Sequence, residues 1–133
     1  MTDDIRDEDY ETLAAFRYQL RRFLRFSEKA AAASGLSVQQ YQALLAIRAE
    51  PGANILIGEL AERLLLQPHS ATGLVDRLQR LGVVRRTPAP DDRRQTRVTL
   101  TTHGEQILAS LAATHRQELA RIGPLLTQVF ARL

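Results

Sequence analysis

The chain has 133 residues, of which 44% are apolar, and this suits one domain with a real core or one domain plus an oligomerisation element. It contains no cysteine, which excludes disulfides, cysteine-based metal sites and a cysteine redox sensor. No stretch has the pattern of a signal peptide or the apolar length of a membrane span, so we expect a cytoplasmic protein.

The net charge is only +3, but it is distributed unevenly along the chain. Residues 1–11 carry six acids and one arginine, whereas residues 63–97 carry eight arginines and three aspartates. A basic patch beside an acidic tail indicates a polyanionic partner.

A long helix is predicted from about Tyr10 to Ala33, where Ser34-Gly35 ends it. The residues of its inner stripe recur at three- and four-residue steps, and they are Leu13, Phe16, Leu20, Phe23, Leu24 and Ser27. Such a helix is too long for one small core, so we expect part of this stripe to face a second subunit. The alternative is an ordinary core helix within one chain.

A second helix is predicted from Ser37 to Glu50, because Ser37 and Gln40 form a capping box. A Pro-Gly turn follows it at residues 51–52, and residues 53–56 are a candidate short strand. Residues 57–66 are then predicted to form a short helix.

The next helix is predicted to begin at Pro68, where the missing N–H of proline costs nothing, and to end before Gly82. Its apolar residues form one buried stripe, and they are Ala71, Leu74, Val75, Leu78 and Leu81. Its other face carries short polar side chains in the first half and arginines in the second. Two short helices joined by a tight turn, the second polar on its outer face, form a helix-turn-helix.

Residues 83–87 and 95–100 are predicted to be two strands, joined by a loop rich in proline and aspartate. A third long helix is predicted to begin at Thr102, with Glu105 completing a capping box, and to break at Gly123-Pro124 before a last short helix. The predicted fold class is mainly α with a small β-ribbon, a winged helix-turn-helix in a single domain over residues 1–133. Residues 10–34 and 102–133 are its dimerisation helices, and residues 36–101 are its DNA-binding lobe.

Three segments in this order and spacing resemble the MarR (multiple antibiotic resistance regulator) family: GELAERL at 58–64, LVDRLQRLGVVRR at 74–86 and DDRRQTRVTLTTHG at 91–104. The resemblance covers nearly the whole chain, from about Tyr10 to Phe130. It implies a homodimer that binds a pseudo-palindromic operator in double-stranded DNA, usually as a repressor. It also implies that a small phenolic or anionic effector releases the DNA from a pocket between the dimerisation helices and the DNA-binding lobe.

The polar face that begins at Pro68 supplies candidates for contact with base edges. His69, Ser70 and Thr72 have short side chains near the helix N-terminus, which is the end that enters a DNA groove. Gly73 lets the helix approach the groove wall closely, although many members of the family carry a larger polar or basic residue there. The alternative for these positions is tolerated variation on a solvated face.

Arginines on the second half of this helix and on the ribbon are candidates for phosphate contact. Arg77 and Arg80 are predicted to meet phosphates or to pair with Asp76 or another acid, and the resemblance gives Arg77 a second role in bracing the wing. Arg86 on the first strand is predicted to bind phosphate or to form a structural pair.

The loop of the ribbon brings Arg93, Arg94 and Arg97 within five residues. A cationic loop suits a narrow minor groove, where the negative potential is enhanced. The resemblance to the D-x-R motif of the family selects Arg94 as the inserted residue, with Asp92 orienting it or the loop. The alternative is a solvated run of charges.

Ligand-binding candidates are Arg17, Arg21, Tyr41 and His115, which would hold an anionic or phenolic group between the helices. The alternative is two surface arginines with a packed tyrosine and a satisfied core histidine. No catalytic motif, metal-ligand spacing or cofactor motif is present, so we predict no enzyme and no cofactor. The alternative function is a winged-helix module that binds proteins and no DNA.

Overall fold

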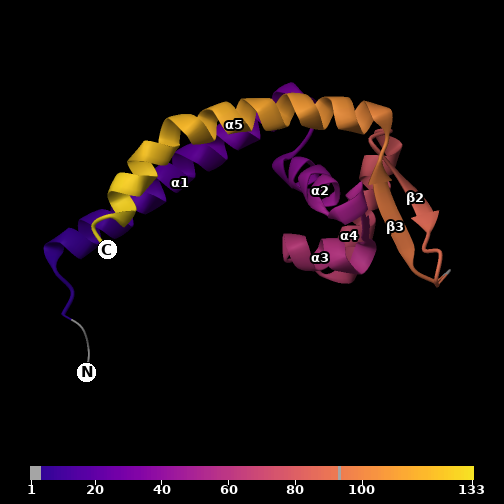
Figure 1. The fold of residues 1–133 in the computed structure, drawn as a ribbon, viewed down its shortest axis with the longest axis horizontal. Coiled ribbons are helices and arrows are strands. Elements are labelled where there is room, and N and C mark those ends of the chain that lie inside the picture. The colour runs from indigo at the N-terminus through magenta and orange to yellow at the C-terminus, as the bar shows by residue number, and fades with distance from the viewer. Residues whose placement is uncertain (1–3, 93) are drawn as a thin grey trace.

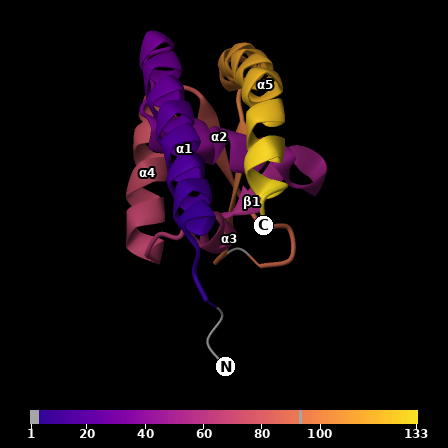
Figure 2. The same cartoon turned by 90° about the vertical axis from the view of Figure 1, so that its left-hand side faces the viewer.

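The computed structural model describes residues 4–92 and 94–133 and places the two long helices of the chain side by side (Figure 1). α1 (Asp7–Ala33) and α5 (Thr102–Phe130) run antiparallel and form a long helical arm. Figure 2 looks along this arm from its free end and shows the rest of the chain behind it. That remainder is a lobe of three helices, α2 (Val38–Ala49), α3 (Ile57–Leu64) and α4 (Pro68–Arg80), with a small sheet.

The sheet has three antiparallel strands in the order β1-β3-β2. β1 spans Asn54–Leu56, β2 spans Val84–Pro88 and β3 spans Thr96–Leu100. β1 confirms the short strand predicted after the Pro-Gly turn, and it pairs with β3 rather than with β2. The sheet and the three helices of the lobe share one core, whose fully buried side chains include Leu44, Ile47, Leu60, Leu74, Leu78 and Val98.

Three predicted helix boundaries in the lobe are confirmed, one at the start of α2 and two at the ends of α4. The backbone N–H of Gln40 donates to the Ser37 hydroxyl oxygen over 3.1 Å, and the Ser37 N–H donates to the Gln40 side chain over 2.9 Å. Pro68 occupies the first turn of α4. Gly82 follows α4 with a φ of 73°, a left-handed conformation that glycine adopts without strain. The chain therefore turns sharply from α4 into the ribbon.

Two predictions about α5 are wrong. The cap is Thr101 rather than Thr102, because the N–H of Gly104 donates to the Thr101 hydroxyl over 3.0 Å, and Glu105 instead pairs with Arg48 at 3.3 Å. The helix also continues through Pro124 to Phe130 instead of breaking. A proline removes one backbone donor and bends a helix, and packing along the arm outweighs that cost here.

The start of α5 is locked against the end of α4 by a contact that we call the α5 seam, made by Thr101 and Gly104 with Gly82 and Val83. The Thr101 hydroxyl donates to the Gly82 carbonyl over 2.6 Å, and the Thr101 N–H donates to the Val83 carbonyl over 3.0 Å. A Cβ on Gly104 would lie 2.1 Å from the Val83 carbonyl oxygen, so only glycine fits. The α5 seam thus joins α4, the ribbon of β2 and β3, and the helical arm.

The arm leaves much apolar surface uncovered. α1 buries only Thr12, Ser27 and Ala31, and α5 leaves several large apolar side chains exposed near its end. The exposed apolar side chains of the arm include Leu13, Leu20, Leu24, Leu119, Leu125 and Phe130. In the part of the chain that the structure describes, no helix is long and apolar enough to span a bilayer.

Candidate nucleic-acid interface

The polar face of α4 is turned outward because its opposite face is anchored in the lobe core. The anchoring residues are Ala71, Leu74, Val75 and Leu78, all of them buried. His69 and Thr72 are exposed, Ser70 is half-buried, and the Thr72 hydroxyl donates to the Pro68 carbonyl over 3.2 Å. The predicted base-reading side chains therefore share one accessible face at the N-terminal end of the helix.

Gly73 has no packing reason to be glycine. A Cβ at this position would come no closer than 3.5 Å to another group, the Arg77 guanidinium, which is ordinary van der Waals contact. A mid-helix glycine costs about 1 kcal/mol relative to alanine. The absence of an internal steric reason is consistent with the predicted close approach to a groove wall.

Arg94 lies in the wing, the loop between β2 and β3. Its side chain extends into solvent and is held by hydrogen bonds to Asp92 of the same loop. The backbone N–H and the Nε of Arg94 both donate to Asp92 Oδ1, over 3.0 and 3.2 Å, while 90% of the Arg94 side chain stays exposed. The predicted contact between Asp92 and Arg94 is therefore present. Arg93 lies outside the described residues.

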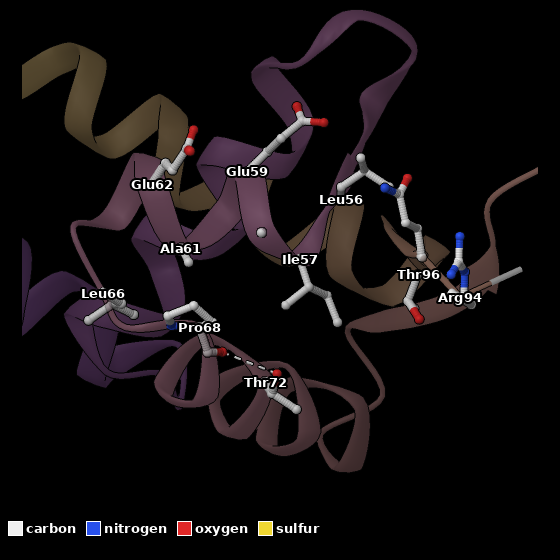
Figure 3. Close-up of a pocket in the computed structure, with 12 residues that line it drawn as sticks. Leu56, Ile57, Glu59, Ala61, Glu62, Leu66, Pro68, Thr72, Arg94 and Thr96 are labelled. Atoms are coloured by element: carbon white, nitrogen blue, oxygen red, sulfur yellow. Dashed lines mark hydrogen bonds between the residues drawn. The ribbon is translucent and has the colours of Figure 1, made fainter. Parts of the chain in front are cut away.

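α3, the start of α4 and the wing surround one groove of about 720 Å³. Figure 3 shows Thr72 and Pro68 on one side of this groove and Arg94 on the other, with Glu59 and Glu62 of α3 along the edge. The fold thus brings together a recognition-helix residue and a wing residue that lie far apart in the sequence. Contacts with base edges and with the DNA backbone at the same time require residues of the helix and of the wing to lie on one surface.

Arg86 and Arg97, two of the candidates for DNA contact, form hydrogen bonds within the chain, and for Arg86 this is the structural pair that the sequence left open. Arg86 donates to Asp76 over 2.5 Å and to Gln79 over 2.6 Å, and so links β2 to α4. Arg97 donates to the Asn54 side chain over 2.8 Å, across the pair of β3 and β1. Gln79 was not among the predicted site residues, although Asp76 and Gln79 lie three residues apart on one helix face and could have indicated a shared partner.

Arg77 and Arg80 remain accessible on the second half of α4. Both side chains are exposed, and neither forms an ion pair with any described residue. Among the described residues, the side-chain contact that links the ribbon to α4 is made by Arg86. This leaves Arg77 and Arg80 free to meet phosphates.

We expect Arg86→Ala to lower both the stability of the lobe and its affinity for DNA. The Arg86–Asp76 pair is partly exposed, so its loss should cost only about 1 kcal/mol of unfolding free energy. The wing should also lose its fixed angle to α4. Urea unfolding followed by circular dichroism measures the first effect, and fluorescence anisotropy with labelled DNA measures the second.

The control is Arg85→Ala, which removes an exposed neighbour on the same strand. Equal behaviour of the two variants would contradict a bracing role.

The ligand-binding candidates are only partly brought together. The rings of Tyr41 and His115 stack with their centroids 4.4 Å apart, so they leave no room for a ligand between them. His115 is buried, with Nδ1 2.7 Å from the Leu111 carbonyl and Nε2 2.8 Å from the Ser27 hydroxyl. Burial raises the pKa of the Tyr41 phenol, which therefore stays neutral. These contacts match a packed tyrosine and a satisfied core histidine.

The other two ligand-binding candidates, Arg17 and Arg21, are exposed on α1. Their guanidinium groups are on the surface of the helical arm, whereas the stacked rings of Tyr41 and His115 are in its interior. The four residues do not enclose one cavity in this structure.

A model of the MarR family matches residues 34–95, which run from the end of α1 to the wing. The transcriptional activatory protein BadR of Rhodopseudomonas palustris is 35% identical over 97 residues, which are 71% of this chain and 55% of that protein. The chain spans about half the length of the curated relatives that it matches.

Solved structures share the arm and the lobe. A mutant of Escherichia coli MarR complexed with operator DNA aligns with a TM-score of 0.68 and 26% identity, over 96% of this chain and 99% of that one. AbsC from Streptomyces coelicolor, a MarR family regulator, aligns with a TM-score of 0.77 and 22% identity, over 90% and 81% of the two chains. The fold defines a winged helix-turn-helix protein. Residues 34–95 match the model of the MarR family, and the chain shares its overall fold with solved MarR family regulators.

Proposed function

We propose that this chain is a homodimeric regulator that binds a pseudo-palindromic operator in double-stranded DNA. The observation that supports this most directly is the groove flanked by the exposed N-terminal end of α4 and by Arg94 of the wing. A recognition helix in the major groove and a cationic wing over the adjacent minor groove need these two elements on one edge.

Within this proposal the residues of the interface have different roles. Ser70 and Thr72 read base edges in the major groove, where hydroxyl groups both donate and accept. Arg77 and Arg80 meet phosphates farther along α4, and these contacts set position rather than sequence. Arg94 enters the minor groove. Arg86 and Arg97 act indirectly, by holding the ribbon in place.

The uncovered apolar surface of the arm supports the homodimer. Exposed apolar patches of this extent mark interaction sites in soluble proteins. The exposed leucines of α1 and the exposed apolar end of α5 lie on the same arm, away from the face of the lobe that carries α4. Pairing two arms about a two-fold axis would place two copies of α4 about 34–36 Å apart, in successive major grooves.

We expect Leu24→Glu to separate the dimer. The substitution would bury an unpaired carboxylate twice in a two-fold interface, and the dissociation constant of the dimer should rise by about a hundredfold or more. Sedimentation velocity over a range of protein concentrations measures this constant. The matched control is Leu65→Glu, because Leu65 is 93% exposed and lies at the turn between α3 and α4. A dimer constant unaffected by Leu24→Glu would place the interface elsewhere.

A genomic selection with purified protein, followed by mobility shifts at several salt concentrations, tests operator binding. A specific fragment with inverted half-sites is the expected result, and the logarithm of its affinity should fall linearly with the logarithm of salt concentration. Recovery of no specific fragment would favour the alternative function, a winged-helix module that binds proteins.

We infer that the regulator acts as a repressor relieved by a small phenolic or anionic effector. A protein that only occupies DNA represses when its operator overlaps a promoter, whereas the relative BadR carries the name of an activator. A reporter gene under the selected operator distinguishes repression from activation. If the regulator is a repressor, its deletion should raise transcription of the reporter. A fall in transcription would show activation instead.

A further inference from the structure

A cationic groove of about 320 Å³ lies between α1 and α5, apart from the groove that faces DNA. Its lining consists of Arg22, Arg25, Phe26 and Lys29 of α1 with Glu118 and Arg121 of α5. Four of these six side chains are cations. We call it the arm groove.

The arm groove has an excess of positive charge that the chain does not balance. Its one acid, Glu118, is paired with Arg121 by two hydrogen bonds. The hydrogen bond from Arg121 lowers the pKa of the Glu118 carboxyl, and the charge of Arg22 lowers it further, so Glu118 stays charged and its single negative charge offsets one of the four positive charges. Within the described ranges, Arg22, Arg25 and Lys29 form no ion pair. Three positive charges thus remain around one small space.

The geometry of the lining suits an anion with more than one acidic group. The Arg22 guanidinium lies over the Tyr18 ring at 5.7 Å from its centroid. A cation–π contact of this kind does not use the N–H donors of the guanidinium in hydrogen bonds, so they remain for carboxylate or phosphate oxygens. Phe26 adds an apolar ring to the lining. We propose that the arm groove binds a small polyanion that carries carboxylate or phosphate groups.

The arm groove would stay open in the proposed dimer. Arg22, Arg25 and Lys29 share one face of α1, because they recur at three- and four-residue steps. At 3.6 residues per turn, this face is roughly 150° around the helix axis from Leu20 and Leu24, which are the α1 part of the apolar surface that supports the dimer. A partner that covers these two leucines of α1 therefore leaves Arg22, Arg25 and Lys29 accessible.

The arm groove is connected to the DNA-binding lobe by aromatic contacts. Phe26 also packs edge-on against His115, with the ring centroids 5.5 Å apart. His115 in turn stacks on Tyr41 of α2, which belongs to the lobe core. A ligand that displaces Phe26 would act on the junction between arm and lobe. This coupling step, unlike binding itself, rests on the proposed function, because it makes the arm groove the effector site of a DNA-binding protein.

Calorimetry without DNA tests binding directly. Citrate represents polycarboxylates and inorganic pyrophosphate represents phosphates, and each is titrated at constant ionic strength set with chloride. We expect saturable binding at one site per chain. The double variant Arg22→Gln/Arg25→Gln should weaken it by about tenfold or more, since it removes two charge-assisted contacts. The control is Arg116→Gln/Arg132→Gln, which removes the same charge from α5 and the C-terminus, and it should stay within about twofold.

The outcomes distinguish binding at the arm groove from nonspecific attraction of anions to positive charge. Binding of one probe alone supports the site and names its chemistry. No saturable binding, an equal loss in both double variants, or a loss confined to Arg17→Gln/Arg21→Gln would overturn it. Circular dichroism confirms that each variant is folded.

Operator affinity with and without the bound anion then tests the coupling. We expect the anion to weaken operator binding by about tenfold or more in the wild type and not in the groove variant. An unchanged operator affinity would overturn the coupling while the site stands. Failure of all DNA binding would instead overturn the proposed function, and the calorimetric result would be unaffected.

Discussion

Replacing Gly104 by alanine is expected to lower the free energy of unfolding by about 3 kcal/mol or more. The added Cβ would lie 2.1 Å from the carbonyl oxygen of Val83 and 2.9 Å from its carbonyl carbon. Both are backbone atoms, so no side-chain rotation relieves the overlap. Relief requires α5 to move away from the ribbon, which would break the two Thr101 hydrogen bonds of the α5 seam.

Gly123→Ala is the matched control, because it makes the same change on the same helix. A Cβ at Gly123 meets nothing within 4 Å. Alanine is about 1 kcal/mol better than glycine in a helix interior, so this variant should be neutral or more stable. Urea unfolding at one fixed protein concentration compares the two, since the proposed dimerisation would make stability concentration-dependent. If the two variants unfold at the same urea concentration, the steric account of the seam is wrong.

Arg94→Ala is expected to weaken operator binding by about 1–3 kcal/mol and to reduce its salt slope by about one. The Arg94 side chain is 90% exposed, and among the described residues its hydrogen bonds go to Asp92 of its own loop. Its removal should therefore leave folding unchanged, and the loss should appear in DNA binding alone. Anisotropy titrations with labelled operator at several salt concentrations measure both quantities.

Two further variants sharpen the result for Arg94. Arg116→Ala removes an exposed arginine from α5, and we expect it to leave affinity and salt slope unchanged. Asp92→Asn retains the cation but weakens its tether, so its affinity should lie between those of the wild type and Arg94→Ala. An Arg94→Ala protein with wild-type affinity at matched salt would refute the wing role.

The parts of the fold that were predicted correctly depend on local chemistry. The apolar stripe of α4, the Ser37 cap, the proline at the start of α4 and the glycine at its end are each set by residues within one turn of chain. Local patterns of this kind also sufficed to place the ribbon and the exposed polar face. The contact between Asp92 and Arg94 was predicted from the resemblance to the D-x-R motif, which lies within one short loop.

The errors concern contacts between distant segments. The Gly123-Pro124 pair has the local pattern of a helix end, but packing of α5 on α1 carries the helix through it. Arg86, Arg97 and Arg94 are alike as isolated cations. Only the fold shows that the first faces Asp76, the second faces Asn54 and the third faces solvent. The steric need for glycine at 104 is equally nonlocal, since the obstructing atom belongs to Val83.

The α5 seam has a mechanical consequence. Because α5 is locked to the end of α4, the lobe and α5 move as one lever. The 29 residues of α5 make this lever about 44 Å long. A tilt of about 5° at the free end of the arm would then swing α4 by about 4 Å. In the proposed dimer, the two copies of α4 would swing in opposite directions. The two swings together would misalign these helices with successive major grooves of DNA, without any rearrangement inside the lobe.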